Sequence, residues 1–144
     1  MTDPRQLADD LALRALNDAF IRHIDRDEVD ALVALFTADA LYVSGGRRVE
    51  GADELRAYFQ ARTAQGPRTS RHFYAGLHVT YPEPDLAHAS SNWMSFAQNG
   101  TPPLSPPLPF LVADFEDVYV RSPDGWRIRQ RRIVPVFRHA PAAG

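Results

Sequence analysis

The chain has 144 residues, of which 44% are hydrophobic and 10% aromatic, and its formal net charge is −2. This length suits one folded domain, and the small negative charge gives no general attraction to nucleic acid. Cysteine is absent, which excludes disulfides, zinc–thiolate sites and thiol nucleophiles. With neither a signal peptide nor the roughly 20 apolar residues of a membrane span, we expect a cytoplasmic protein.

The chain opens with a predicted long helix. Asp3 can cap its N-terminus and Pro4 suits the first turn. Apolar residues then recur at helical spacing as far as Ile24. Residues 25–27 interrupt this pattern, and Asp27 is the predicted cap of a second, short helix. The apolar face of that helix is Val29, Leu32, Val33, Leu35 and Phe36.

A short strand over 40–44 is predicted next, followed by a Gly45-Gly46 turn and a return strand over 47–50. Gly51 leads into a third helix, which ends near Gly66-Pro67. The remainder is rich in aromatic and β-branched residues. It predicts four long strands, over 71–81, 86–98, 110–121 and 126–138, with a loop over 101–109, where five prolines exclude a central strand.

This order of elements, helices first and then mainly antiparallel strands, indicates an α+β fold. A curved sheet wrapped around helices leaves a cone whose open end can hold a ligand. We expect residues 1–144 to form a single domain, with residues 1–5 and 139–144 frayed.

Asp25 and His72 are candidate acid–base residues. Asp25 lies at the junction of the first two helices, and because Asp27 is better placed to cap, Asp25 is available for another role. His72 begins the first long strand, and an imidazole can exchange protons near neutral pH. Taken alone, a junction aspartate and a strand histidine are more often structural.

The facing of His72 poses a conflict. Strand alternation places His72, Tyr74 and His78 on one face. The opposite face is apolar and suits packing against helices. A bulge or twist near Gly76 would break this register and allow His72 to lie inside.

Further along, Asn92 is a candidate ligand-binding residue. On the last strand, alternation places Arg132 on the apolar face with Trp126 and Ile128. A buried arginine there would need a structural carboxylate or a ligand oxygen. The other arginines of this strand predict a solvated face rather than a nucleic-acid site.

No sequence motif supports a nucleophile elbow, a phosphate-binding loop or a dinucleotide site. His23 and Asp27 share a helical spacing, but two such residues do not specify a metal site. We therefore predict no metal and no cofactor.

Several segments resemble SnoaL-like proteins of the NTF2-like superfamily. Residues 20–40 (FIRHIDRDEVDALVALFTADA) resemble the family's opening, where a helix ends in an aspartate. Residues 49–55, 69–73 and 124–134 resemble its entry to the third helix, its strand-opening histidine and its closing strand. The resemblance covers most of the chain. It implies a cone-shaped α+β barrel of the cystatin/NTF2-like type, with three N-terminal helices on a curved, mixed or antiparallel sheet.

Scytalone dehydratase and a dehydrochlorinase of this superfamily use an aspartate–histidine pair without a cofactor, and Asp25 and His72 match those positions. The resemblance thus implies a lyase or isomerase acting on a small apolar molecule. Ile24 replaces a tyrosine of the dehydratase, and the dehydrochlorinase's lysine is missing, so reaction type and substrate stay open. The candidate substrate-binding residues are Tyr42, Tyr74, Asn92, Phe110 and Arg132.

Two non-enzymatic interpretations also remain open. The chain resembles the β subunits of ring-hydroxylating dioxygenases, which share the fold and are usually longer, and it also suits a small-molecule-binding or assembly module. Since long strands offer apolar residues on both faces, we expect a homodimer or homotrimer through the outer sheet face. We expect neither a nucleic acid nor a membrane as a partner.

Overall fold

A computed structural model describes residues 3–105, 109 and 111–139. It has three α-helices and one 3₁₀ turn, which are α1 (Pro4–Asp25), α2 (Val29–Val33), α3 (Gly51–Gln60) and η1 (Ala61–Thr63). The strands are β1 (Phe36–Ser44), β2 (Arg47–Glu50), β3 (Arg68–Glu83), β4 (Leu86–Asn99), β5 (Leu111–Ser122) and β6 (Gly125–Arg138). No helix among the described residues is long and apolar enough to cross a membrane.

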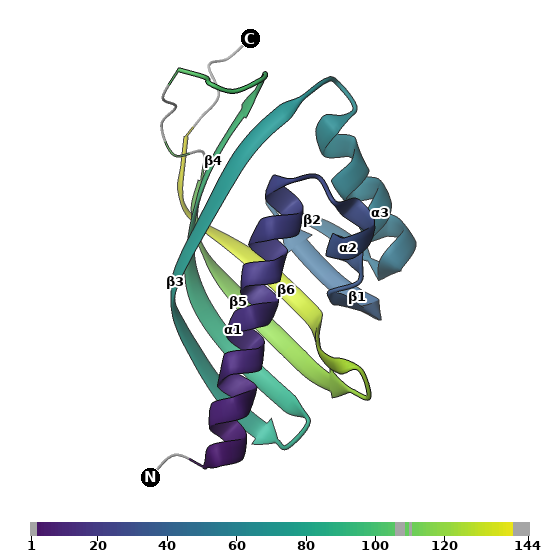
Figure 1. Cartoon of the computed structure of the whole chain (residues 1–144), viewed down its shortest axis with the longest axis vertical. Helices are drawn as coiled ribbons and strands as arrows, with labels where there is room; N and C mark the ends of the chain where they lie inside the picture. Colours follow the sequence, from purple (N-terminus) through teal and green to yellow (C-terminus); the bar gives the residue numbers. More distant parts are fainter. Residues whose placement is uncertain (1–2, 106–108, 110, 140–144) are drawn as a thin grey trace.

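The six strands form one sheet in the order β2-β1-β6-β5-β4-β3. The pairing of β1 with β6 is parallel and all other pairings are antiparallel, so the sheet is mixed. The long strands curve around α1, while α2 and α3 lie over β1 and β2 (Figure 1). The predicted α+β arrangement of three helices on a curved sheet is confirmed.

The predicted start of α1 is confirmed, because the Asp3 side chain accepts a hydrogen bond from the backbone N–H of Arg5 at 2.9 Å. The helix begins at Pro4, as the sequence predicts. The predicted cap of α2 is wrong. Asp27 adopts a left-handed backbone conformation (φ 54°) that turns the chain, and Glu28 occupies the N-cap position. Phe36, expected on this helix, instead begins β1.

The bulge anticipated at Gly76 exists. The pairing of β3 with β4 shifts between Ala75 and His78, and Gly76 has a φ of 67°. Before the bulge, His72 and Tyr74 face the helices. After it the inward set is Leu77, Val79 and Tyr81. The bulge therefore resolves the conflict between a polar and an apolar inner face.

A second bulge, in β6, overturns the expectation for Arg132. Val118 pairs with Gln130 but Tyr119 pairs with Ile128, so Arg129 has no partner in the ladder. The extra residue reverses the alternation, and Arg131 turns inward with 0% exposure while Arg132 is exposed.

Candidate functional site

A cavity of about 490 Å³ lies between α1, α3 and the inner face of the sheet. Its volume falls within the roughly 300–1,000 Å³ usual for small-molecule sites. Its wall is mostly apolar and aromatic, with Phe20, Tyr42, Tyr58, Phe59, Trp93 and Phe115 contributing rings. The polar groups on the wall include His72 and Ser95.

Asp25 is the last residue of α1, where the helix dipole presents its negative end. The negative end of the dipole disfavours a carboxylate at this position. Hydrogen-bond donors from β3 offset this effect on Asp25. Asp25 Oδ1 accepts a hydrogen bond from Ser70 Oγ at 2.9 Å, and Oδ2 accepts one from the backbone N–H of His72 at 3.0 Å. Ser70 and His72 are two positions apart on the same strand face, and the helix end lies against them.

The imidazole of His72 completes the arrangement. His72 Nδ1 lies 2.6 Å from Asp25 Oδ1, and the two side chains are 14% and 7% exposed. Burial is the largest single influence on the Asp25 carboxyl and raises its pKa. The hydrogen bonds and charge from His72 and the bond from Ser70 outweigh burial, so the pKa of Asp25 is below its ordinary value. Because an ionised Asp25 can only accept a hydrogen bond, the contact requires a proton on Nδ1, and Nε2 of the neutral ring is then unprotonated. His72 is part of the cavity wall.

Tyr42 lies on the same wall and is 4% exposed. Its ring contacts those of Phe36, Tyr58 and Phe59. Burial, helped by the neighbouring Tyr58, raises the pKa of Tyr42, so its hydroxyl stays protonated. Since no hydrogen bond of this hydroxyl occurs within the described part of the chain, it is a candidate donor to a ligand oxygen.

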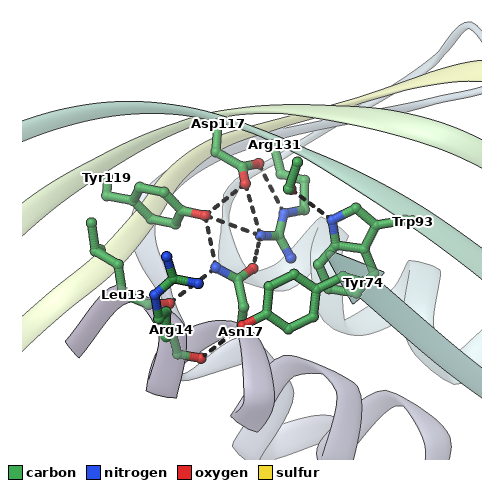
Figure 2. Close-up of polar contacts among 9 residues, drawn as sticks. Leu13, Arg14, Asn17, Tyr74, Trp93, Asp117, Tyr119 and Arg131 are labelled. Carbon is green, nitrogen blue, oxygen red and sulfur yellow. Dashed lines mark hydrogen bonds and ion pairs between the residues drawn. The ribbon is translucent and has the colours of Figure 1, made fainter. Parts of the chain in front are cut away.

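Beneath the aromatic rings lies a fully buried polar network (Figure 2). Arg131 donates to both carboxylate oxygens of Asp117, at 2.9 Å each, and also to Asn17. Tyr119 donates to Asp117 and accepts from Asn17. Burial alone would lower the pKa of Arg131, but the charge of Asp117 raises it, so the guanidinium is charged.

One guanidinium nitrogen of Arg131, Nη1, has no hydrogen-bond partner among the residues that the structure describes. The guanidinium carbon instead lies 4.5 Å from the ring centroid of Phe20, 5.0 Å from that of Phe115 and 5.3 Å from that of Trp93. These distances allow the electron-rich rings to stabilise the cation. Arg131 does not line the cavity itself but packs against three of the rings that do.

The other predicted site residues lie elsewhere. Tyr74 stacks on Trp93, and its hydroxyl reaches Asp18 on α1 rather than the cavity. Asn92 is exposed on the outer face, because its neighbours Ser91 and Trp93 face inward. Arg132 is exposed because the bulge in β6 turns Arg131 inward in its place. Phe110 lies outside the described residues.

A larger hollow of about 600 Å³ lies at the opposite end of α1. Arg121 bridges two of the acidic groups on its wall, with contacts of 2.7 Å to Asp9 and 2.9 Å to Asp85. Its wall carries no histidine, so we regard the smaller cavity as the candidate active site. Within the described residues, no group of three or more histidine, aspartate or glutamate side chains is arranged to hold a metal.

The sequence profile of the SnoaL-like domain matches residues 5–132. A candidate scytalone dehydratase from Novosphingobium aromaticivorans has a TM-score of 0.82 at 17% identity, covering 96% of this chain and 93% of that chain. A candidate dehydratase of the NTF2-like family from Streptomyces avermitilis has a TM-score of 0.75 at 21% identity, covering 90% and 98%. A candidate aromatic ring hydroxylase from N. aromaticivorans has a TM-score of 0.73 at 19% identity, covering 94% and 93%. No curated protein matches the sequence.

Proposed function

Because the chain belongs to the SnoaL-like domain family, we propose that it is a cofactor-free lyase or isomerase that removes a proton from a small, largely apolar molecule. The observation that carries this proposal is the 2.6 Å contact between His72 Nδ1 and Asp25 Oδ1 at the cavity wall. Two structural neighbours are candidate dehydratases, which is consistent with this class of reaction.

In the proposed reaction, His72 Nε2 takes a proton from a carbon next to an electron-withdrawing carbonyl group. Asp25 fixes the tautomer of His72 and stabilises the imidazolium that forms. The electrons of the broken C–H bond form a new double bond. In a lyase, the group on the neighbouring carbon then leaves with its bonding electrons, and a departing hydroxide can take the proton from the imidazolium. In an isomerase, the proton returns to a different carbon.

Tyr42 would donate a hydrogen bond to the carbonyl oxygen as negative charge develops on it. Such a donor is most effective in a site that excludes water, because the local dielectric is low. The aromatic wall provides that environment on the sheet side of the cavity.

The similarity to a candidate aromatic ring hydroxylase supports a second candidate function. In it, the domain is a non-catalytic subunit of an oxygenase or a module that binds a small molecule. The cavity would then hold a small molecule without converting it, and His72 would have only a structural role.

The test is a panel of aromatic ketones with a hydroxyl or halide on the β carbon, followed by absorbance of the conjugated product. His72→Ala should lower turnover by about 10²- to 10⁴-fold, the usual contribution of a general base, with the melting temperature within a few degrees of wild type. Asp25→Asn should retain some activity. The matched control is His78→Ala on the outer side of the same strand, which should leave turnover unchanged.

Unfolding of His72→Ala would assign His72 a structural role. If the panel binds to the wild-type protein without any turnover, the binding-module interpretation is favoured instead.

A further inference from the structure

The cavity wall has an uneven distribution of charge. Its described residues include three arginines, Arg62, Arg68 and Arg138, and no aspartate or glutamate. The chain as a whole has two more acidic than basic residues. The wall therefore concentrates positive charge in a protein that is slightly negative overall, and positive walls attract anions.

Arg62 is held close to the proposed base. Its Nη1 donates to the carbonyl oxygen of Ile24 at 3.2 Å, which fixes the guanidinium at the end of α1. Its Nη2 lies 3.5 Å from Ser70 Oγ, which is 2.9 Å from Asp25 Oδ1, which in turn is 2.6 Å from His72 Nδ1. These three contacts together limit the separation of Arg62 Nη2 and His72 Nδ1 to about 9 Å. One small molecule can span both groups.

Arg68 lies near Arg62. Burial lowers the pKa of Arg68, and the positive charge of Arg62 lowers it further, with Asp27 offsetting part of the effect. Both guanidinium groups line the same cavity, so an oxyanion bound there would interact favourably with two positive charges.

Another part of the wall suits the aromatic ring of a ligand. Trp93 is stacked between Tyr74, at 4.9 Å, and Phe115, at 4.3 Å, so both faces of its ring are covered. Only the ring edge is left to contact the cavity, and that edge carries partial positive charge. It complements the electron-rich face of an aromatic ligand.

We propose that the substrate of this site is an aromatic carboxylate, with its carboxylate bound by Arg62 and Arg68 and its ring against Trp93 and Phe115. The planar fork of a guanidinium matches a carboxylate, which is why we choose this anion. The proposal deepens the proposed function, on which it rests for the placement of the reacting C–H bond beside His72.

The test compares the binding of 2-naphthoate with that of its neutral analogue 2-naphthamide by titration calorimetry. Wild-type protein should prefer 2-naphthoate by roughly 10- to 100-fold, as expected for charge-assisted hydrogen bonds. Arg62→Gln with Arg68→Gln should reduce the preference to about threefold or less. Arg62→Lys, which keeps the charge, should retain part of it. The matched control is Arg132→Gln, an exposed arginine on the outer face, which should not change it.

The proposal is overturned if 2-naphthoate does not bind, if 2-naphthamide binds equally well, or if the control variant lowers the preference as much as the double variant. Melting temperatures show whether each variant is folded, and Arg62→Lys supplies the comparison if the double variant is not. His72→Ala should keep the preference for 2-naphthoate. The carboxylate proposal and the catalytic proposal can therefore fail separately.

Discussion

Arg131 and Asp117 form an ion pair in which neither side chain has any exposed surface, with Arg131 Nη2 2.9 Å from Asp117 Oδ2. The pair lies on neighbouring strands, directly opposite in the β5–β6 ladder. Its position behind Phe20 and Trp93 links the stability of the sheet to the shape of the cavity wall.

Removing one member of this pair should be strongly destabilising. Arg131→Met leaves Asp117 buried without its cation, and we expect a loss of about 3–5 kcal/mol in the free energy of unfolding. Arg131→Met combined with Asp117→Leu should recover much of that loss, because no unpaired charge remains. Urea unfolding of both variants measures the difference. A single variant that loses less than about 1 kcal/mol would contradict the proposed role of the pair.

The bulge in β3 should depend on glycine. Gly76→Ala places a Cβ 2.9 Å from Asn92 Nδ2 at a φ of 67°, so it should lower stability by about 1–2 kcal/mol. Adding Asn92→Ala removes the close contact but not the backbone strain, and should restore only part of the loss. Gly46→Ala is the matched control, since Gly46 has a φ of 81° and nothing within 4 Å of the added Cβ. Equal losses for Gly76→Ala and Gly46→Ala would show that the contact with Asn92 is unimportant.

Stability should fall at acidic pH. The hydrogen bond from Arg121 is the main cause that lowers the pKa of Asp9, and the His72 and Ser70 contacts lower that of Asp25 against the effect of burial. A carboxyl with a lowered pKa in the folded state stabilises the fold above its unfolded pKa, about 3.9, and the stabilisation is lost as pH falls through the folded pKa.

We therefore expect the free energy of unfolding to decrease below about pH 4, and Asp9→Asn to make this decrease shallower. Urea titrations at a series of pH values measure the slope. Asp53→Asn, at an exposed position on α3, serves as the control. An acid slope that is the same in Asp9→Asn as in wild type would contradict the assignment.

The outer face of the sheet carries a row of apolar side chains. Phe73 pairs with Met94, Met94 with Val112, and Val112 with Phe137, across four strands. Phe73 is 54% exposed and Phe137 is 71% exposed. We expect a second copy of the chain to cover this row.

Light scattering at micromolar concentration should accordingly give a dimeric or trimeric mass for wild type and a smaller mass for Phe73→Glu. Thr80→Glu, farther along the outer face of β3, should leave the mass unchanged. A monomeric wild-type protein would refute the expectation.

The helices and strands could be predicted because their apolar periodicities are local. The β3 bulge was also predictable, since Gly76 marks it within an otherwise regular pattern. The β6 bulge at Arg129 carries no such residue, so simple alternation pointed to Arg132 rather than Arg131.

The candidate site was predictable only in part. Asp25 and His72 were found through their positions in segments that resemble SnoaL-like proteins, and the structure places them in contact. Arg62 was missed because it follows α3 in a 3₁₀ turn, where no periodicity indicates which side faces the cavity. Ser70 had a signal that was not used, its two-residue spacing from His72 on one strand face.

The proposed reaction requires that Asp25 hold a proton on His72 Nδ1, so that Nε2 is unprotonated and can act as the base. Long-range ¹⁵N–¹H correlation spectra of histidine-labelled protein report directly which ring nitrogen carries the proton, and a His72→Gln sample assigns the signal among the five histidines. We expect the Nδ1–H tautomer for the neutral ring in wild type, and loss of that preference in Asp25→Ala. A neutral His72 protonated on Nε2 in the wild-type protein would contradict it.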